Sequence, residues 1–304
     1  MTTPPPHLAQ HQPDTRRGRS KVGEGARAAG GRRRPGFHPD TALRAGAAEA
    51  VGTFFLIYTG TATAAAGALG KATAGSPPDS LAVALAFGLV LVAMVGALGQ
   101  VSGAHLNGAV TIGLAVAGKF PWRYVPTYLL SQLAGAIAGA GATWLTFGSV
   151  ARDQAHLGAT VPSAGVSDGR AFIVEVLITF LLVFVVTAVA TDTRVPAALA
   201  APSIGFALVA AVLIGGGITG GAVNPDRALG PAIMAGTYDS LWLYVVADII
   251  GGVVAALLYV HGVGIATAPT VEAADVSHET EKGDWSDGDE ETGAGNRNVQ
   301  SATH

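Results

Sequence analysis

Stretches of mostly apolar residues recur through the middle of the chain, separated by short polar segments. A helix needs roughly 20 such residues to cross the hydrocarbon core of a bilayer. Six stretches reach this length, and they run approximately over residues 46–68, 80–100, 124–148, 171–191, 197–217 and 241–263. Glu49, Glu175 and Asp248 are the few acidic or basic residues inside them. The pattern therefore predicts an all-α membrane protein with six transmembrane helices.

Two further apolar stretches are too short to cross a bilayer. They cover about residues 105–117 and 224–235, with Asn107 and Asn224 at or near their starts. Apolar segments of about 10–14 residues are more often re-entrant than spanning. Non-helical backbone at membrane depth persists only where protein or a water-filled cavity satisfies its polar groups. We therefore expect two re-entrant half-helices that line a cavity.

The two halves of the chain repeat each other, over about residues 45–150 and 170–263. Residues 48–54, 102–107 and 132–135 resemble residues 174–180, 219–224 and 248–251, in that order. Each half holds three spans and one short helix, and an odd number of spans forces the halves into opposite orientations. Inverted repeats with broken helices place a permeation site at the membrane midplane, between the halves.

Charge is concentrated at the two ends of the chain. Residues 1–44 hold nine of the eighteen Lys and Arg residues, and residues 268–304 are acidic and polar. Such compositions are typical of disordered tails. Six spans place both tails on the same side of the membrane, and the basic N-terminal segment favours the cytoplasmic side. We therefore expect a domain over residues 45–267 in the cell membrane, with both termini cytoplasmic.

Composition excludes several classes of function. Half of the residues are hydrophobic and only 13% are charged, against about 25% in a soluble domain. The chain has no Cys, which excludes disulfides, thiol catalysis and Cys-ligated metal sites. A net charge of −3 gives no case for nucleic acid binding. No nucleophile elbow, phosphate loop or zinc motif occurs, so we expect no enzyme activity, cofactor or metal.

The carboxylates inside the predicted spans are candidates for function, because charge at membrane depth is costly. Glu49 and Glu175 could form a proton relay, or they could accept hydrogen bonds from backbone N–H groups of the non-helical loops. Their symmetric placement in the two repeats favours the second interpretation. For Asp248 we expect a buried carboxyl that is hydrogen-bonded or protonated. His105 has no second His at metal-ligand spacing, so we interpret it as bracing its loop.

Asn224 and Pro225 suit the start of a helix, because Asn is a preferred N-cap and Pro fits the first helical position. Two half-helices inserted from opposite faces would meet at their N-termini, each carrying about half a positive charge. Their meeting point would repel cations. If each Asn carbonyl caps its own helix, the NH2 groups of Asn107 and Asn224 can donate to water in the lumen. That arrangement breaks a proton-conducting chain of waters.

These motifs together resemble the aquaporin, or major intrinsic protein, family over roughly residues 46–263. The resemblance is carried by Ala-Glu-Ala-Val-Gly-Thr at 48–53, Ser-Gly-Ala-His-Leu-Asn-Gly-Ala-Val-Thr at 102–111, Asn-Pro-Asp-Arg-Ala-Leu-Gly-Pro at 224–231 and Gly-Gly at 251–252. It implies a passive channel for water or another small neutral solute. It also implies a homotetramer in the lipid bilayer, with one pore in each subunit.

The family signature is Asn-Pro-Ala in both halves, and this chain departs from it twice. The first copy consists of Asn107, Gly108 and Ala109, and the second of Asn224, Pro225 and Asp226. Gly108 lacks the fixed φ of Pro and loosens the start of its half-helix. Asp226 places a carboxylate where the family has a methyl group. We expect Gly108 to make room for Asp226, and Asp226 to cap its own half-helix and face away from the lumen.

The resemblance also implies a narrow selectivity filter, placed by spacing from the two Asn residues at Phe87, Val212, Gly221 and Arg227. Phe87 and Arg227 match water-selective members, whereas Val212 stands where those members have His. We therefore expect a wider and less polar filter than that of a strict water channel. Ala228 follows Arg227 where glycerol-type members usually carry Asp, which disfavours a typical glycerol facilitator.

Three alternatives stay open at this point. The channel could serve a small neutral solute such as glycerol, ammonia or a metalloid acid. Inverted repeats with broken helices also occur in ion-coupled secondary transporters, which would use Glu49, Glu175 or Asp248 as a pathway carboxylate. Finally, Gly108 and Asp226 could close the pore and leave a non-conducting member of the family.

Overall fold

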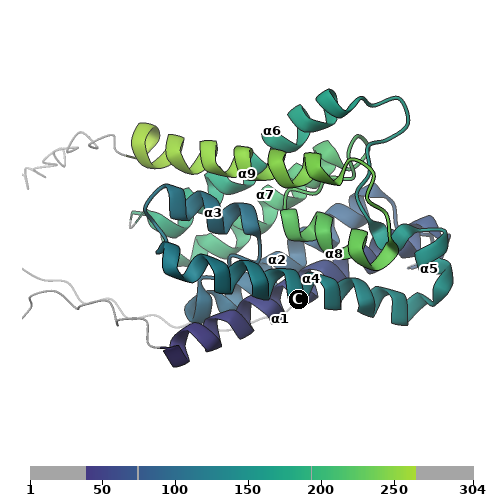
Figure 1. The fold of residues 1–304 in the computed structure, drawn as a ribbon, viewed down its shortest axis with the longest axis horizontal. Helices are drawn as coiled ribbons and strands as arrows, with labels where there is room; N and C mark the ends of the chain where they lie inside the picture. Colours follow the sequence, from purple (N-terminus) through teal and green to yellow (C-terminus); the bar gives the residue numbers. More distant parts are fainter. Residues whose placement is uncertain (1–38, 74, 193, 265–304) are drawn as a thin grey trace, which may run out of the picture. The chain divides into compact units, whose positions relative to one another are not determined.

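The computed structural model describes residues 39–264, apart from residues 74 and 193 (Figure 1). In this part of the chain every continuous element is helical, and the one strand-like feature is an isolated bridge between Thr73 and Ser76. The long helices are α1 (Pro39–Ala68), α2 (Ser80–Ser102), α4 (Val125–Phe147), α6 (Asp168–Thr191), α7 (Ala200–Gly215) and α9 (Leu241–Leu258). The shorter helices are α3 (Gly108–Val116), α5 (Ser149–Asp153) and α8 (Pro225–Ala235), with single turns η1 (Trp122–Tyr124), η2 (His156–Gly158), η3 (Ala197–Leu199) and η4 (Tyr259–Val263).

The predicted fold class is confirmed: six long helices and two half-helices form an all-α membrane domain. Among the described residues, five helices are both long and apolar enough to cross a membrane, namely α1, α2, α6, α7 extended by η3, and α9 extended by η4. The sixth, α4, has 23 residues but is less apolar. Its polar side chains Gln132 and Thr143 are fully buried, so they are hydrogen-bonded within the protein instead of facing lipid.

Helix α1 begins at Pro39, before the predicted start of its span at residue 46. Pro39 stands where the helix begins, and Pro is common at the first helical position. This turn is helical without being apolar, so a hydropathy pattern does not detect it. The remainder of the predicted tails, residues 1–38 and 268–304, lies outside the described residues.

Glycines let the long helices of each half approach closely. A Cβ on Gly135 of α4 would overlap the carbonyl oxygen of Ala50 on α1, and a Cβ on Gly251 of α9 would overlap that of Val176 on α6. Ala50 and Val176 each follow the Glu of their repeat, Glu49 or Glu175, by one residue. The α1–α4 and α6–α9 pairs therefore use the same close crossing, as expected of a repeat, and small residues are what allow it in a membrane.

The half-helices interlock the two repeats. Helix α3 of the first half packs against α9 of the second, and α8 of the second half packs against α4 of the first (Figure 1). Both begin immediately after the predicted residue, since Asn107 precedes α3 and Asn224 precedes α8. Each is too short to cross a bilayer, as expected. Because each half-helix packs against the other repeat, the loops that precede Asn107 and Asn224 come together in one region.

The outward faces of the long helices are apolar. Large hydrophobic side chains with high exposure include Leu89 on α2, Ile173 and Leu177 on α6, Phe206 on α7 and Val254 on α9. Many exposed large apolar side chains on helices of membrane length suit contact with lipid or another membrane protein. The chain is thus a multi-pass membrane protein, and the carboxylates inside its long helices, Glu49, Glu175 and Asp248, are buried.

Candidate functional site: a cavity where the half-helices meet

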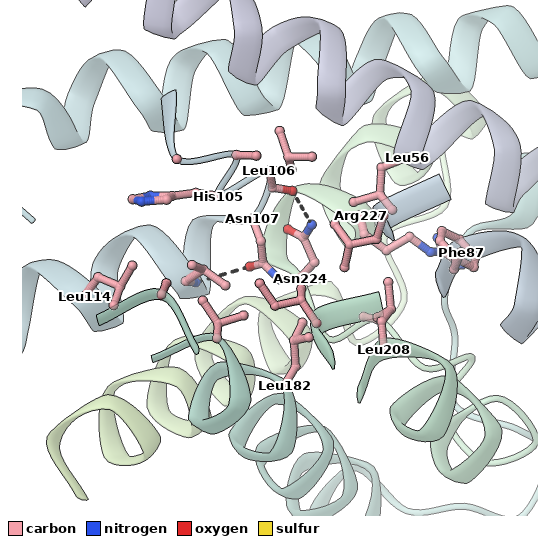
Figure 2. Close-up of a pocket in the computed structure, with 18 of the residues that line it drawn as sticks. Leu56, Phe87, His105, Leu106, Asn107, Leu114, Leu182, Leu208, Asn224 and Arg227 are labelled. Carbon is pink, nitrogen blue, oxygen red and sulfur yellow. Dashed lines mark hydrogen bonds between the residues drawn. The ribbon is translucent and has the colours of Figure 1, made fainter. Parts of the chain in front are cut away.

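A cavity of about 180 Å³ lies between the two halves, with a wall contributed by both of them (Figure 2). The predicted site residues that line it are Phe87, His105, Asn107, Val212, Gly221, Asn224 and Arg227. Among the described residues, the predicted ones that stand behind this wall are Glu49, Gly108, Ala109, Glu175, Pro225 and Asp226. The structure therefore gathers at one cavity residues that lie in both halves of the sequence.

Asn107 and Asn224 each cap a half-helix and also bind the opposite loop. The side-chain oxygen of Asn107 accepts a hydrogen bond from the backbone N–H of Ala109 at 2.8 Å, and Asn224 caps α8 in the same way. The NH2 of Asn107 donates to the carbonyl of Val223 at 2.8 Å. The NH2 of Asn224 donates to the carbonyl of Leu106 at 2.9 Å (Figure 2). An amide NH2 has two N–H groups, so each Asn keeps one N–H that these bonds do not use, and the expectation that each NH2 donates to water in the lumen stays a prediction.

Glu49 holds the loop that precedes Asn107. Its carboxylate accepts hydrogen bonds from the backbone N–H groups of His105 at 2.9 Å and Leu106 at 2.6 Å. It also accepts from the Ser102 hydroxyl at 2.7 Å and from the Gln132 side-chain amide at 2.8 Å. Glu49 is fully buried, and these donors occupy both of its oxygens. The geometry favours the bracing interpretation over a proton relay.

Glu175 plays the same part in the second half. It accepts from the backbone N–H groups of Ala222 and Val223, both at 3.0 Å, and from the Thr219 hydroxyl at 2.5 Å. These bonds hold a strained backbone, since Val223 has φ 60° and Leu106, in the first half, has φ 50°. A positive φ is rare in any residue with a Cβ and rarest in a β-branched one such as Val. Strain of this kind persists only where the surroundings enforce it.

His105 lies at one end of the cavity, packed among aromatic rings. Its ring centroid is 4.8 Å from that of Phe120 and 5.0 Å from that of Tyr128, and its Nδ1 lies 3.1 Å from the Thr111 hydroxyl. No group of three His, Cys, Asp or Glu side chains that could hold a metal ion occurs in the described part of the chain. The contacts fit a residue that fixes its loop.

Arg227 and Phe87 stand together in the cavity wall. The guanidinium carbon of Arg227 lies 5.1 Å above the centre of the Phe87 ring, within range of a cation–π contact (Figure 2). Arg227 is only 5% exposed, and its Nε and Nη1 atoms have no hydrogen-bond partner among the described residues. Buried donors without partners are costly, and Arg227 brings a positive charge to the cavity wall in spite of that cost. Val212 and Gly221 complete the four expected filter positions.

Apart from Lys119 and Thr191, the rest of the wall is apolar, and the sequence patterns did not identify it. It includes Leu56 of α1, Val110 and Leu114 of α3, Leu182 and Val186 of α6, and Ile204 and Leu208 of α7. A signal was present, because Ile204, Leu208 and Val212 are spaced four residues apart and must share one face of a helix. A polar line of donors therefore faces an apolar wall.

Charged residues collect at the end of the cavity near Lys119 and Thr191. Here the guanidinium of Arg194 donates to the carboxylate of Asp192 at 2.5 Å, and the Tyr259 hydroxyl donates to the same carboxylate at 3.0 Å. The hydrogen bonds from Arg194 hold the pKa of Asp192 well below its usual range. The hydrogen bond from Tyr259 ties the loop after α6 to the end of α9.

Comparison with known proteins gives the same picture as the geometry. The family model described as "Major intrinsic protein" matches residues 37–259. "Aquaporin NIP1-1" of Zea mays is 38% identical over 212 residues, which cover 70% of this chain and 72% of that protein. "Aquaporin NIP3-1" of Oryza sativa subsp. japonica is 42% identical over 222 residues, covering 73% and 69%. This chain belongs to the major intrinsic protein family.

A solved member of the family shares the fold. The aquaglyceroporin from Plasmodium falciparum superposes with a TM-score of 0.66 and 27% identity, over 73% of this chain and 96% of that one. The six long helices and two half-helices are therefore the aquaporin fold. Members of this family are membrane channels, so the chain is a multi-pass membrane channel for water or small neutral solutes.

The departure of this chain from the family signature takes an unexpected form. The expectation that Asp226 caps its own half-helix is wrong: its Oδ2 accepts a hydrogen bond from the backbone N–H of Gly108, on the opposite half-helix, at 2.9 Å. Asn224 already caps α8, whereas the start of α3 has a free N–H because Gly replaces Pro there. Asp226 is 4% exposed and lies outside the cavity lining.

Proposed function

We propose that this channel conducts water, and in addition small neutral solutes, through the cavity between Asn107 and Asn224. The observation that carries the proposal is the meeting of two half-helix N-termini at a cavity with a few donors on one side and an apolar wall on the other. Apolar walls offer no hydrogen bonds, so a passing molecule aligns with the donors. Similarity to proteins named aquaporin and aquaglyceroporin supports the same conclusion.

Exclusion of protons and cations follows from the same geometry. A water between Asn107 and Asn224 would accept a hydrogen bond from the remaining N–H of each side chain. Its oxygen is then fully used as an acceptor, so that water cannot accept a proton from a neighbouring water and pass it on. The half-helix N-termini add a positive field at this point. Arg227 contributes a full positive charge in the wall. We propose that these three groups together admit only neutral solutes.

The filter residues favour solutes larger than water. Val212 and Gly221 offer little bulk and no side-chain hydrogen bond, whereas Phe87 and Arg227 keep one side aromatic and polar. We propose glycerol, ammonia or a metalloid acid as candidate solutes beside water. Ala228 argues against a typical glycerol facilitator, so a small uncharged hydroxylated or amine solute fits best.

Passive flow is favoured over ion-coupled transport. Glu49 and Glu175 are fully buried, and backbone donors occupy their carboxylates. Neither they nor Asp248 line the cavity formed by the described residues. A coupling carboxylate must reach the permeation path to bind its ion. We further propose the cell membrane as the location, both termini in the cytoplasm, and a homotetramer as the assembly.

Stopped-flow light scattering on vesicles that hold the purified protein tests this function. Vesicles with the protein should shrink faster than empty ones in an osmotic gradient, and should swell faster in an inward gradient of a permeant neutral solute. A pH-sensitive dye inside the vesicles should report no added proton leak. Shrinkage no faster than that of empty vesicles would indicate a non-conducting member, and solute flux driven by a proton or sodium gradient would indicate a transporter.

A further inference from the structure

The start of α3 differs chemically from the start of α8. Pro225 occupies the first position of α8 and has no N–H, whereas Gly108 occupies the first position of α3 and has one. The first N–H groups of a helix have no partner within the helix. The N–H of Gly108 is buried, so it needs an acceptor from elsewhere. A family member with Pro at this position has no such donor to satisfy.

Asp226 supplies the missing acceptor from the other half of the protein. Its carboxylate lies 2.9 Å from the Gly108 nitrogen and is almost fully buried. A family member with Ala at this position has no side-chain acceptor. The two departures from the signature therefore meet in one hydrogen bond, between residues that are 118 positions apart in the sequence.

Space around Gly108 is limited on the same side. A Cβ there would lie 3.2 Å from the Asp226 Oδ2, 3.3 Å from the Leu129 Cδ2 and 3.7 Å from the Pro225 Cγ. An Ala side chain would fit only with a small shift. A Pro ring places its Cδ on the nitrogen, where the N–H now points at Asp226, so it would remove the donor and collide with the acceptor.

We propose that Gly108 and Asp226 form one unit, in which Asp226 is a positioning residue that caps the opposite half-helix and fixes the distance between the two Asn residues of the pore. The unit replaces the Pro and Ala of the family signature together. It acts alongside the two bonds from Asn107 to Val223 and from Asn224 to Leu106, which join the same loops. Asp226 influences the permeating solute only through the position of α3.

A double-mutant cycle tests the pairing. Gly108→Pro and Asp226→Ala should each lower the midpoint of thermal unfolding by roughly 5 °C, because one buries a carboxylate without its donor and the other buries a donor without its acceptor. The double variant, which restores the family signature, should recover most of that loss. Asp239→Ala, which changes an exposed carboxylate beside α8, serves as the control and should change nothing. Additive losses in the cycle would overturn the proposal.

A second pair of variants at residue 226 tests whether Asp226 acts as a hydrogen-bond acceptor, or only through its volume or its negative charge. Asp226→Asn keeps an oxygen that can accept from Gly108, so its stability and water permeability should stay near those of the parent. Asp226→Ala, with α3 displaced, should admit a proton leak measured by a dye inside the vesicles. Equal damage from Asn and Ala would overturn the capping role. The permeability measurements rest on the proposed function, whereas the unfolding cycle does not. A failed cycle would therefore overturn the pairing of Gly108 with Asp226, and absence of water flux in the parent protein would overturn the proposed function.

Discussion

Arg227 is the residue whose environment is hardest to explain without a solute. It is buried in an apolar wall, it rests on the Phe87 ring, and two of its nitrogens lack partners within the described chain. A guanidinium carries five N–H donors in a rigid plane. The described residues supply no acceptor to Nε and Nη1, so a cation that enters the cavity would meet the positive charge of Arg227 in its wall.

Arg227→Val should therefore remove charge exclusion and admit larger neutral solutes or cations, with water flux retained. Ion conductance in planar bilayers and solute uptake by light scattering measure the two effects. Arg152→Val is the matched control, because Arg152 also lies over an aromatic ring, at 5.0 Å from that of Trp144, but is exposed. If neither selectivity nor conductance changes in Arg227→Val, the residue has no place in the filter.

Asp248 occupies the position in the second repeat that Gln132 occupies in the first. It precedes Gly251 as Gln132 precedes Gly135, and both glycines make the same close helix crossing. Gln132 donates an amide hydrogen bond to Glu49, whereas the carboxyl of Asp248 faces Glu175. Its Oδ1 accepts from the Thr179 hydroxyl at 3.0 Å, but its Oδ2 has no partner in the described structure.

Asp248→Asn should accordingly stabilise the protein, because an amide at this position can donate to Glu175 as Gln132 donates to Glu49. A net gain of about 0.5–1.5 kcal/mol is the usual range for one hydrogen bond, and it should appear as a higher unfolding midpoint in detergent. Asp248→Leu, which cannot donate, is the comparison variant. A midpoint for Asn that lies at or below the parent value would show that the symmetry argument fails.

At the scale of helices, the bilayer removes the hydrophobic force between them, so tight backbone contact has to supply the attraction. Helix α4 illustrates this point, since it is not among the five described helices that are apolar enough to span by composition, yet it crosses α1 at two glycines. Cβ atoms on Gly135 and Gly139 would meet the carbonyl oxygens of Ala50 and Phe54. Glycine here is required by the distance between backbones.

Gly135→Ala should cost about 1–3 kcal/mol of stability, the usual range for overpacking a tight contact. Gly141→Ala on the same helix is the control, because its Cβ would meet only the end of Met234 at 3.5 Å. Ala is also the better helix former, so this control should be neutral or slightly stabilising. Thermal unfolding in detergent compares the two, and equal midpoints would rule out the proposed backbone contact.

At the scale of the whole molecule, the pore exists only because the two halves interlock. Each half-helix rests on a long helix of the opposite repeat, and three hydrogen bonds join the loops at their tips. The cavity wall then takes its donors from both halves and its apolar side from α1, α3, α6 and α7. No single repeat contains the site.

Mercury reagents should leave the native channel unaffected by any thiol reaction, since the chain has no Cys. Val212→Cys places a thiol in the cavity wall and should make water flux sensitive to mercury, with recovery on adding a free thiol. Stopped-flow scattering measures both proteins. Inhibition of the native channel that free thiol reverses would contradict the first expectation, and an insensitive Val212→Cys would place the water path elsewhere.

The sequence by itself determined the membrane class, the six long helices, the two half-helices and the repeat, because bilayer crossing depends on local length and apolarity. The two short apolar stretches located the Asn pair, and resemblance to the family predicted the four filter positions, whose residues all line the cavity. The start of α1 and the apolar cavity wall were missed, the first because its opening turn is polar.

Tertiary structure alone decided which groups meet across the two halves. It tied one donor of each Asn to the opposite loop, placed Asp248 beside Glu175, and directed Asp226 to Gly108 instead of to its own helix. These partners are far apart in sequence, most of them by more than 100 residues. Their contacts depend on how the repeats pack, so no local pattern of residues records them.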